Sequence, residues 1–373
     1  MKKLSTYHLA ILLCLSLVLV HCQEKEEQII EPDPPTEADS KTKDDLSNAR
    51  YVDNIYPDRP WDDIYDNVIN AHAGGIYYEN GFYHWYGEHK VPGTSERTGY
   101  THGGIHLYRS RDLINWNDLG IVLSVDYNNP NSDLAYGCIV QRPKVVRNPR
   151  TGKYVAFFKL YLKGNGYRVC HTGVATADQA RGPFTYSHKF LAASPEFGSG
   201  DFALFQTGNG DLYHFTVRKG DRAFVKARMR SDYMYPATSY TQCSGVANGT
   251  EAPAMFYKSG TYHLFGSRSD GWRPTDPRYY TSRSLDGPWV NQGNPLSGTN
   301  SVTGIGPDKT FGGQSTFINQ IQGKENQYIL MMDVWKPEDP ITSRYIWLPF
   351  RVKNRKIEVR WTDRWNLDWF NNN

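Results

Sequence analysis

Two carboxyl residues stand at the start of apolar segments and could act together in acid catalysis. Glu251 opens the segment Glu-Ala-Pro-Ala-Met-Phe, and Asp201 precedes Phe-Ala-Leu-Phe. Cleavage of a glycosidic bond needs a carboxylic acid that protonates the leaving oxygen, and a second carboxylate commonly assists. If the two side chains lie close together, the charge of Asp201 raises the pKa of Glu251 and keeps it protonated near neutral pH. The alternative is a structural role in which both carboxylates pair with Lys or Arg.

Three further polar residues stand at equivalent places in front of apolar segments. They are His72 in Asn-Ala-His-Ala-Gly-Gly, Gln141 in Gln-Arg-Pro-Lys and Gln314 in Gly-Gln-Ser-Thr-Phe. Burying five such groups together is costly unless they are hydrogen-bonded or used for chemistry. The sequence therefore predicts one polar site to which five similar segments contribute.

Each of these segments belongs to a repeated unit of two β-rich runs joined by a turn with Gly or Asn. The units cover residues 75–87, 143–159, 202–216, 253–267 and 315–333. Alternating apolar residues and Asn-Gly, Thr-Gly and Ser-Gly turns are typical of β-hairpins. The units recur about every 50 to 65 residues, which leaves room for four strands each. We expect an all-β, five-bladed β-propeller, in which the innermost strands meet at a central channel; a β-sandwich and a β-helix are the alternatives.

The N-terminus has the layout of an export signal. Two lysines precede an apolar run over residues 9–20, which is too short to cross a bilayer, and Cys22 follows. The tetrapeptide Leu-Val-His-Cys resembles the lipid-attachment motif of bacterial lipoproteins, and the acidic run after it resembles a surface-export signal. We expect a signal peptide over residues 1–22, lipidation of Cys22 and an exported outer-membrane lipoprotein that faces the cell surface. A plain secretory signal is the alternative.

Composition limits the remaining organisation and the partners. Residues 23–50 are polar and acidic with few large apolar side chains, which predicts a disordered tether ahead of a catalytic domain over residues 51–373. The net charge is +3 with scattered basic residues, so we expect no nucleic-acid partner and a membrane contact through the lipid only. Cys138, Cys170 and Cys243 fit neither a disulfide framework nor a zinc site, and we expect no metal and no cofactor.

Several segments together resemble glycoside hydrolase family 43, in the branch that contains exo-β-1,3-galactanases. They include AHAGGIYYENGFYHWYGE (71–88), QRPKVVRNPRTGKYV (141–155), SGDFALF (199–205), EAPAMFYKSGTYHLFGS (251–267) and SRYIWLPF (343–350). The resemblance covers nearly all of residues 51–370. It implies an inverting five-bladed propeller in which Glu251 is the general acid and Asp201 modulates its pKa and orients it.

The chain departs from the family pattern at the position of the general base. Most members have Asp-Pro at the start of the first blade, where this chain has His72-Ala73. In the exo-galactanase branch a glutamine in the fifth blade is proposed to hold the attacking water, through its imidic-acid tautomer, and Gln314 matches it. We predict that Gln314 positions the water; a role limited to hydrogen bonding is the alternative. His72 is expected either to replace the base or to close the channel as a structural histidine.

We expect five residues to bind substrate, of which Gln141, Trp272 and Trp335 match positions near the site in this branch. Ordinary packing is the alternative for the two tryptophans, and surface solvation is the alternative for Glu88. The five residues are His72, Glu88, Gln141, Trp272 and Trp335, and Gln141 stands where the branch usually has Glu. We therefore expect an inverting, exo-acting hydrolase that cleaves β-linked galactose from β-1,3-galactan or galactan side chains. An α-L-arabinofuranosidase, a β-galactosidase and a surface glycan-binding lipoprotein without turnover are the alternatives.

Overall fold

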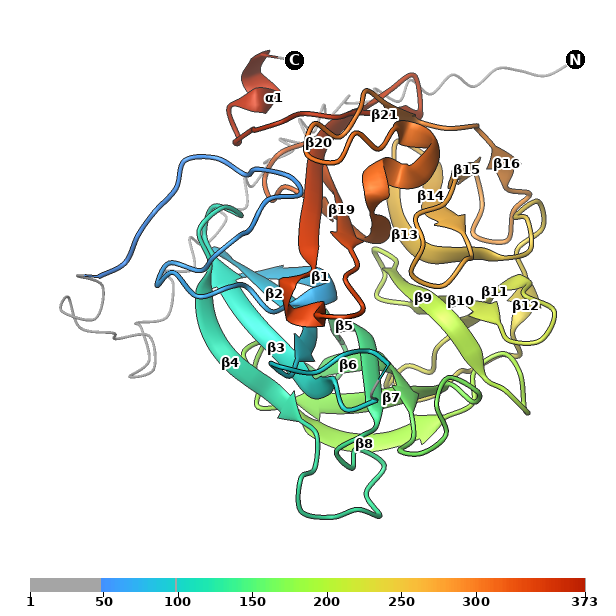
Figure 1. The fold of residues 1–373 in the computed structure, drawn as a ribbon. Coiled ribbons are helices and arrows are strands. Elements are labelled where there is room, and N and C mark those ends of the chain that lie inside the picture. The colour runs from blue at the N-terminus through green and yellow to red at the C-terminus, as the bar shows by residue number, and fades with distance from the viewer. Residues whose placement is uncertain (1–47, 98, 373) are drawn as a thin grey trace, which may run out of the picture. The chain divides into compact units, whose positions relative to one another are not determined.

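A computed structural model describes residues 48–97 and 99–372, which form five sheets arranged around one axis (Figure 1). Blade 1 contains β1 (His72–Glu79), β2 (Phe82–Lys90), β3 (His102–Ser110) and β4 (Asn117–Ser124). Blade 2 contains β5 (Ile139–Arg147), β6 (Tyr154–Tyr161), β7 (His171–Ala177) and β8 (Thr185–Phe190). In both blades consecutive strands pair antiparallel, as expected for hairpins in series.

Blades 3 and 4 repeat this order with short outer strands. Blade 3 contains β9 (Ser199–Gln206), β10 (Leu212–Arg218), β11 (Phe224–Arg228) and β12 (Thr241–Gln242). Blade 4 contains β13 (Thr250–Lys258), β14 (Thr261–Arg268), β15 (Pro277–Ser282) and β16 (Val290–Asn291).

Blade 5 differs because one of its strands comes early in the chain. It contains β18 (Gln314–Gln320), β19 (Tyr328–Val334), β20 (Arg344–Lys353) and β21 (Lys356–Arg360), and β17 (Leu296–Ser297) pairs parallel with β21 at its outer edge. The other elements are the 3₁₀ turns η2 (Pro307–Gly312) and η3 (Pro340–Thr342) and the helix α1 (Trp369–Asn372).

The five innermost strands close a ring. Strand β1 packs against β5 and β18, β9 packs against β5 and β13, and β13 packs against β18. The sheets are therefore blades of a five-bladed β-propeller, which confirms the predicted fold. A β-bridge between Ile55 and Trp365 joins the segment before blade 1 to the segment after blade 5.

Aromatic side chains fill the space between adjacent blades. Trp85 of blade 1 lies 4.7 Å from Trp347 of blade 5 between ring centroids, and Trp116 packs 5.2 Å from Trp85. All eight residues of β6 are buried, because both faces of this strand are covered by neighbouring blades. The high aromatic content of the chain thus serves mainly to pack sheet against sheet.

The predicted hairpins are confirmed, and the predictions for the N-terminus remain untested. The five repeated units correspond to the first two strands of the five blades. The signal peptide, the lipidated Cys22 and nearly all of the predicted tether lie outside the described residues. In residues 48–97 and 99–372, no helix is long and apolar enough to span a membrane.

Candidate active site

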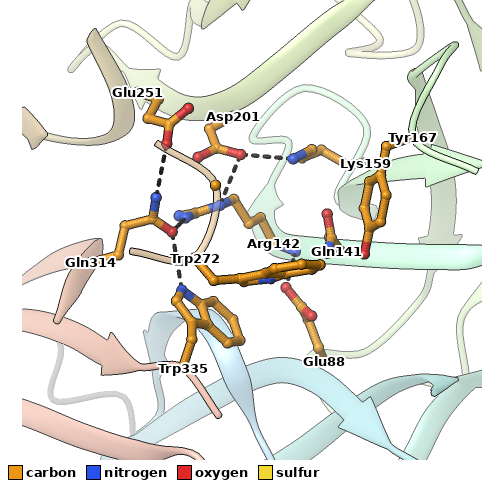
Figure 2. A pocket seen from close by; sticks show the side chains of 11 residues that line it. Glu88, Gln141, Arg142, Lys159, Tyr167, Asp201, Glu251, Trp272, Gln314 and Trp335 are labelled. Atoms are coloured by element: carbon orange, nitrogen blue, oxygen red, sulfur yellow. Dashed lines mark hydrogen bonds and ion pairs between the residues drawn. The ribbon is translucent and has the colours of Figure 1, made fainter. Parts of the chain in front are cut away.

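An open cavity of about 300 Å³ lies where the inner strands begin (Figure 2). The structure brings together seven residues predicted for the site: Glu88, Gln141, Asp201, Glu251, Trp272, Gln314 and Trp335. Four further residues line the same cavity: Arg142, Lys159, Tyr167 and Gly271. Buried charged groups form its floor and exposed aromatic rings its rim, since Glu88 is 1% exposed and Trp272 is 38% exposed.

His72 is the exception among the predicted site residues. Its side chain is completely buried and stacks on Tyr345, with ring centroids 5.2 Å apart. The nearest charged group is Asp333, whose Oδ2 lies 3.6 Å from Nδ1 of His72. His72 does not line the cavity: its ring lies in the contact between blades 1 and 5, with its centroid 6.3 Å from that of the cavity residue Trp335. Substrate binding by His72 stays a prediction.

A β-bulge at the start of three inner strands aims the site residues. Ala73, Arg142 and Ala252 have φ values of 49°, 52° and 54°, which non-glycine residues rarely adopt. Each follows a predicted site residue, and the strand register shifts at the same place. Such bulges bend a strand and redirect its side chains.

The backbone N–H of each bulged residue donates a hydrogen bond to a carboxylate from the preceding blade. Asp201 Oδ2 accepts from the N–H of Ala252 at 3.1 Å, and Glu88 Oε1 accepts from the N–H of Arg142 at 2.9 Å. Asp333 Oδ2 accepts from the N–H of Ala73 at 2.7 Å. Asp201 therefore fixes the backbone next to Glu251, which is the physical basis for an orienting role.

Asp201 is a buried carboxylate held between two cations. Its Oδ1 lies 2.7 Å from Nζ of Lys159 and 3.0 Å from Nε of Arg142. Burial by itself would raise the pKa of Asp201, but the charges of Arg142 and Lys159 and the hydrogen bond from Ala252 hold it well below its ordinary value. Asp201 is consequently ionised at neutral pH.

Glu251 has the opposite protonation preference. Burial is the largest effect that raises the pKa of Glu251, and the negative charge of Asp201 raises it further. Smaller effects of Ser269, Arg142 and Lys159 lower it. The pKa values of two carboxyl groups in one cavity are thus moved apart, with that of Asp201 lowered and that of Glu251 raised. This division of roles is what acid-assisted glycoside hydrolysis requires.

Gln314 is held in one orientation by three hydrogen bonds (Figure 2). Its Oε1 accepts from the guanidinium of Arg142 and from Nε1 of Trp335, the latter at 3.0 Å. Its Nε2 donates to Oε1 of Glu251 at 3.1 Å. Arg and Trp side chains are donors only, so the carbonyl oxygen of Gln314 must face them.

This arrangement bears on the tautomer of Gln314. In an imidic acid the oxygen carries a proton and would meet two donors that cannot accept it. The ordinary amide is therefore the tautomer that fits these hydrogen bonds. One N–H of its nitrogen donates to Glu251, and the second N–H is free to donate to another oxygen atom. Gln314 can donate to a water molecule here. Its nitrogen cannot take a proton, because the lone pair of an amide nitrogen is delocalised into the carbonyl group.

Glu88 belongs to a charged network under one side of the cavity. Its Oε2 lies 2.7 Å from Nζ of Lys90, which also contacts Glu96 at 2.6 Å. All three residues are buried, and the hydroxyl of Tyr167 donates to Glu96 at 3.2 Å. The carboxylate of Glu88 is thus occupied on both oxygens, by Lys90 and by the amide of Arg142, and it serves to fix the floor of the cavity.

Two aromatic rings from opposite blades meet at the rim. Tyr167 lies in the loop between β6 and β7, and Trp272 lies in the loop between β14 and β15. Their ring centroids are 6.0 Å apart in an edge-to-face arrangement, and each ring is almost 40% exposed. Exposed aromatic faces of this kind suit the apolar C–H face of a sugar ring.

Arg142, Lys159 and Tyr167 were not predicted from the sequence. Arg142 follows Gln141 directly, and Lys159 is the register partner of Gln141 at the end of the neighbouring strand. In the first hairpins of blades 1 and 5, the strand register likewise places Glu88 opposite His72 and Asp333 opposite Gln314. A polar residue near the end of the second strand of a hairpin therefore indicates a site residue, and this signal could have predicted Lys159. Tyr167 lies in a loop and carried no such signal.

No group of three or more His, Cys, Asp or Glu side chains in residues 48–97 and 99–372 is arranged to hold a metal ion. Cys138, Cys170 and Cys243 are buried and free. A propeller cavity in which a Glu of raised pKa lies beside an ionised Asp contains the pair of carboxyl groups that glycoside hydrolysis uses.

Comparison with known proteins gives the family. Residues 74–333 match the model of glycosyl hydrolases family 43. The chain belongs to this family and is a glycoside hydrolase. Comparison with curated proteins finds no match.

Solved structures of the same family resemble the chain over most of its length. A family 43 β-1,3-galactosidase with galactodeoxynojirimycin is 33% identical, with a TM-score of 0.76 over 84% of this chain and 100% of that chain. An exo-β-1,3-galactanase from Phanerochaete chrysosporium with β-1,3-galactotriose is 27% identical, with a TM-score of 0.71 over 84% of this chain and 68% of that chain. An exo-β-1,3-galactanase from Clostridium thermocellum is 27% identical, with a TM-score of 0.70 over 83% of this chain and 66% of that chain.

Proposed function

We propose that the chain is an inverting, exo-acting hydrolase that releases galactose from the end of β-1,3-linked galactan. The observation that carries this proposal is the convergence of Glu251, Asp201 and Gln314 in one cavity, with their hydrogen bonds already in place. The cavity volume of about 300 Å³ is at the small end of ligand sites, which favours one terminal sugar over an internal stretch of chain.

Glu251 is the general acid in this proposal. Its proton passes to the glycosidic oxygen as the bond from the sugar C1 to that oxygen breaks, and the leaving oxygen keeps the bonding electron pair. Asp201 remains ionised and stabilises the positive charge that develops on the sugar ring in the transition state. Arg142 and Lys159 keep Asp201 in this state by ion pairing.

Gln314 holds the attacking water in this proposal. The free N–H of its amide donates to the water oxygen, which leaves a lone pair of that oxygen for attack on C1. Attack from the face opposite to the leaving group inverts the anomeric centre. The second proton of the water is lost to solvent through the open cavity, since Asp201 and Glu88 accept hydrogen bonds on both of their oxygens.

The sugar is assigned from the relatives and from the remaining contacts. The neighbours are a β-1,3-galactosidase and exo-β-1,3-galactanases. Gln141 lines the cavity, and its side-chain amide has no hydrogen-bond partner in the described part of the chain, so donor and acceptor are both free for sugar hydroxyls. Trp272 and Trp335 supply aromatic faces at the rim and the wall.

The test is incubation of the protein with β-1,3-galactan and with a panel of galactose- and arabinose-containing glycans. Proton NMR during the first minutes should show free α-galactose, which mutarotates later. Initial release of β-galactose would contradict inversion, and release of arabinose alone would overturn the sugar assignment. Binding of oligosaccharide without release would favour a non-catalytic glycan-binding protein. Glu251→Gln serves as the inactive control.

We also propose that the protein is an exported lipoprotein on the outer membrane, displayed to polysaccharide outside the cell. The support is the charged start, the short apolar run and Cys22 in the sequence. Labelling of cells with a palmitate analogue should mark the unaltered chain and leave Cys22→Ala unlabelled. Labelling of both variants, or of neither, would contradict the proposal.

A further inference from the structure

Three tyrosines form an exposed cluster outside the cavity, here called the tyrosine platform (Tyr100, Tyr127 and Tyr136). Tyr136 lies in the middle, with its ring centroid 5.3 Å from Tyr100 and 4.8 Å from Tyr127. Tyr136 is half-buried on the core between blades 1 and 2, whereas Tyr100 is 45% and Tyr127 58% exposed. The cluster is thus anchored on one ring and offers two rings to solvent.

The platform lies on the same face of the propeller as the cavity. Tyr100 belongs to the loop between β2 and β3, and Tyr127 and Tyr136 belong to the loop between β4 and β5. Because neighbouring strands run antiparallel, these loops open on the face where β1 and β5 begin. Tyr136 is five residues before Gln141, so the chain from the platform to that cavity residue spans at most about 18 Å.

The loop that carries the rim residue Tyr167 also reaches the platform. A side chain at Gly137 would meet Cε1 of Tyr100 at 2.9 Å and Cγ of Lys163 at 3.4 Å. Lys163 and Tyr167 are in the same loop, between β6 and β7. Gly137 has a φ of 100° and no Cβ, which lets the ring of Tyr100 pack on the backbone there. The loop of Tyr167 and the loop of Tyr100 therefore meet beside Gly137, next to the platform.

The backbone under the platform is held in place before any ligand arrives. Oδ1 of Asp126 accepts from the N–H groups of Asn128 and Asn129 at 3.0 and 2.9 Å. The N–H of Tyr136 donates to the carbonyl of Asp126 at 2.8 Å. A surface that is already ordered loses little entropy when it binds, which favours recognition over incidental exposure of apolar rings.

We propose that the tyrosine platform binds the polysaccharide beyond the sugar that is cleaved, and so holds the substrate chain between successive cuts. This inference rests on the proposed function. The occupant is the continuing chain of β-linked galactose units, because the platform lies on the face of the propeller that carries the cavity and offers uncharged rings with polar hydroxyl edges. Such rings match the alternating apolar faces and hydroxyl edges of a pyranose chain.

The test compares a polymer with a disaccharide. In Tyr100→Ala/Tyr127→Ala, we expect the ratio of kcat/KM on β-1,3-galactan to kcat/KM on β-1,3-galactobiose to fall by about tenfold, because one exposed stacking surface is lost. Tyr257→Ala is the matched control. Tyr257 is 48% exposed and packs 4.7 Å from Tyr262 at the turn of the β13–β14 hairpin, at the opposite end of that strand from Glu251. An unchanged ratio in the double variant would overturn the proposal.

Binding without turnover separates this proposal from the proposed function. In a Glu251→Gln background, native gels that contain galactan should retard the protein, and the two Tyr→Ala changes should remove most of the retardation. The unaltered protein could release no galactose and still be retarded by a different polysaccharide in a way that depends on the platform tyrosines. This result would overturn the assigned substrate and support glycan binding by the platform. Failure of every polysaccharide to retard the Glu251→Gln chain, or self-association that depends on these tyrosines, would refute the platform as a glycan site.

Discussion

The guanidinium of Arg142 donates a hydrogen bond to Oε1 of Gln314, and so links blade 2 to blade 5 across the cavity. The same side chain contacts Asp201, and its backbone N–H donates to Glu88. Arg142 therefore fixes the direction of the Gln314 amide while it neutralises Asp201. The amide nitrogen of Gln314 is left facing Glu251, as its proposed role as a donor to the attacking water requires.

Substitution of Gln314 should separate water positioning from other roles. We expect Gln314→Ala to lower kcat by about 100-fold, since one donor at the reacting centre is lost. We expect Gln314→Glu to move the alkaline limb of the kcat profile to higher pH by roughly one unit, because two carboxyl groups would then share a proton. The measurement is the pH dependence of galactose release. Gln320→Ala, at the exposed end of the same strand, is the control. Near-normal turnover in Gln314→Ala would contradict the assigned role.

Asp201→Asn should change the pH at which activity is lost. Glu251 must be protonated to act, so activity falls as pH rises through its pKa. Asp201 raises that pKa, and without it Arg142 and Lys159 are left as unbalanced cations near Glu251. We expect the alkaline limb to move to lower pH by roughly one unit or more, together with a loss of kcat. A lower kcat with an unmoved limb would show that Asp201 acts only through the backbone of Ala252.

Glu251→Gln should be sensitive to the leaving group. A general acid contributes about 10² to 10⁴ in rate when the leaving oxygen needs a proton. We expect that loss on β-1,3-galactobiose and a much smaller one on an aryl galactoside with an acidic phenol, because that phenolate leaves without protonation. The measurement is kcat/KM for a series of aryl galactosides against phenol pKa. Equal losses on all substrates would remove Glu251 as the acid.

Lys144 gives a prediction for stability. Its side-chain nitrogen is buried and donates to the carbonyls of Ala73 and Gly74 at 2.9 and 3.0 Å. Burial, with a smaller effect of Arg142, lowers the pKa of Lys144 from 10.5 to about 7. Between these values the unfolded chain binds a proton that the folded chain does not, so the free energy of unfolding should rise with pH. The slope is at most about 1.4 kcal/mol per pH unit.

Denaturant unfolding at pH 7.5, 8.5 and 9.5 tests this. We expect the rise to disappear in Lys144→Met and to persist in Lys153→Met, since Lys153 is half exposed and paired with Asp178 on the surface. Parallel pH curves for Lys144→Met and the unaltered protein would show that Lys144 keeps its proton on folding through this range.

Much of the fold follows from local signals in the sequence. Alternating apolar residues and turns such as Asn80-Gly81 and Ser259-Gly260 specify hairpins, because the side-chain period and the turn conformation depend on neighbouring residues only. Two of these turn residues, Asn80 and Ser259, have positive φ as their turns require. Five hairpins at similar spacing then allow few arrangements other than a ring of blades.

The meeting of the site residues follows from that ring. Gln141, Asp201, Glu251 and Gln314 each stand within the first three residues of an inner strand, so closure of the propeller brings them to one cavity. His72 occupies the same place in blade 1 and does not join them. Its ring stacks on Tyr345 of blade 5, and the N–H of the bulged residue Ala73 donates to Asp333 of the same blade. The position of His72 therefore depends on residues of blade 5.

The sequence by itself thus determined the propeller and the meeting of Glu251 and Asp201 at one site, because the positions of hairpins and strand starts follow from local sequence patterns. Only the tertiary structure decided which groups surround them. Arg142 reaches Gln314 across 172 positions of sequence, and Tyr167 meets Trp272 from another blade. Contacts of this kind depend on how the blades close and how the loops pack, and no local pattern of side chains encodes that geometry.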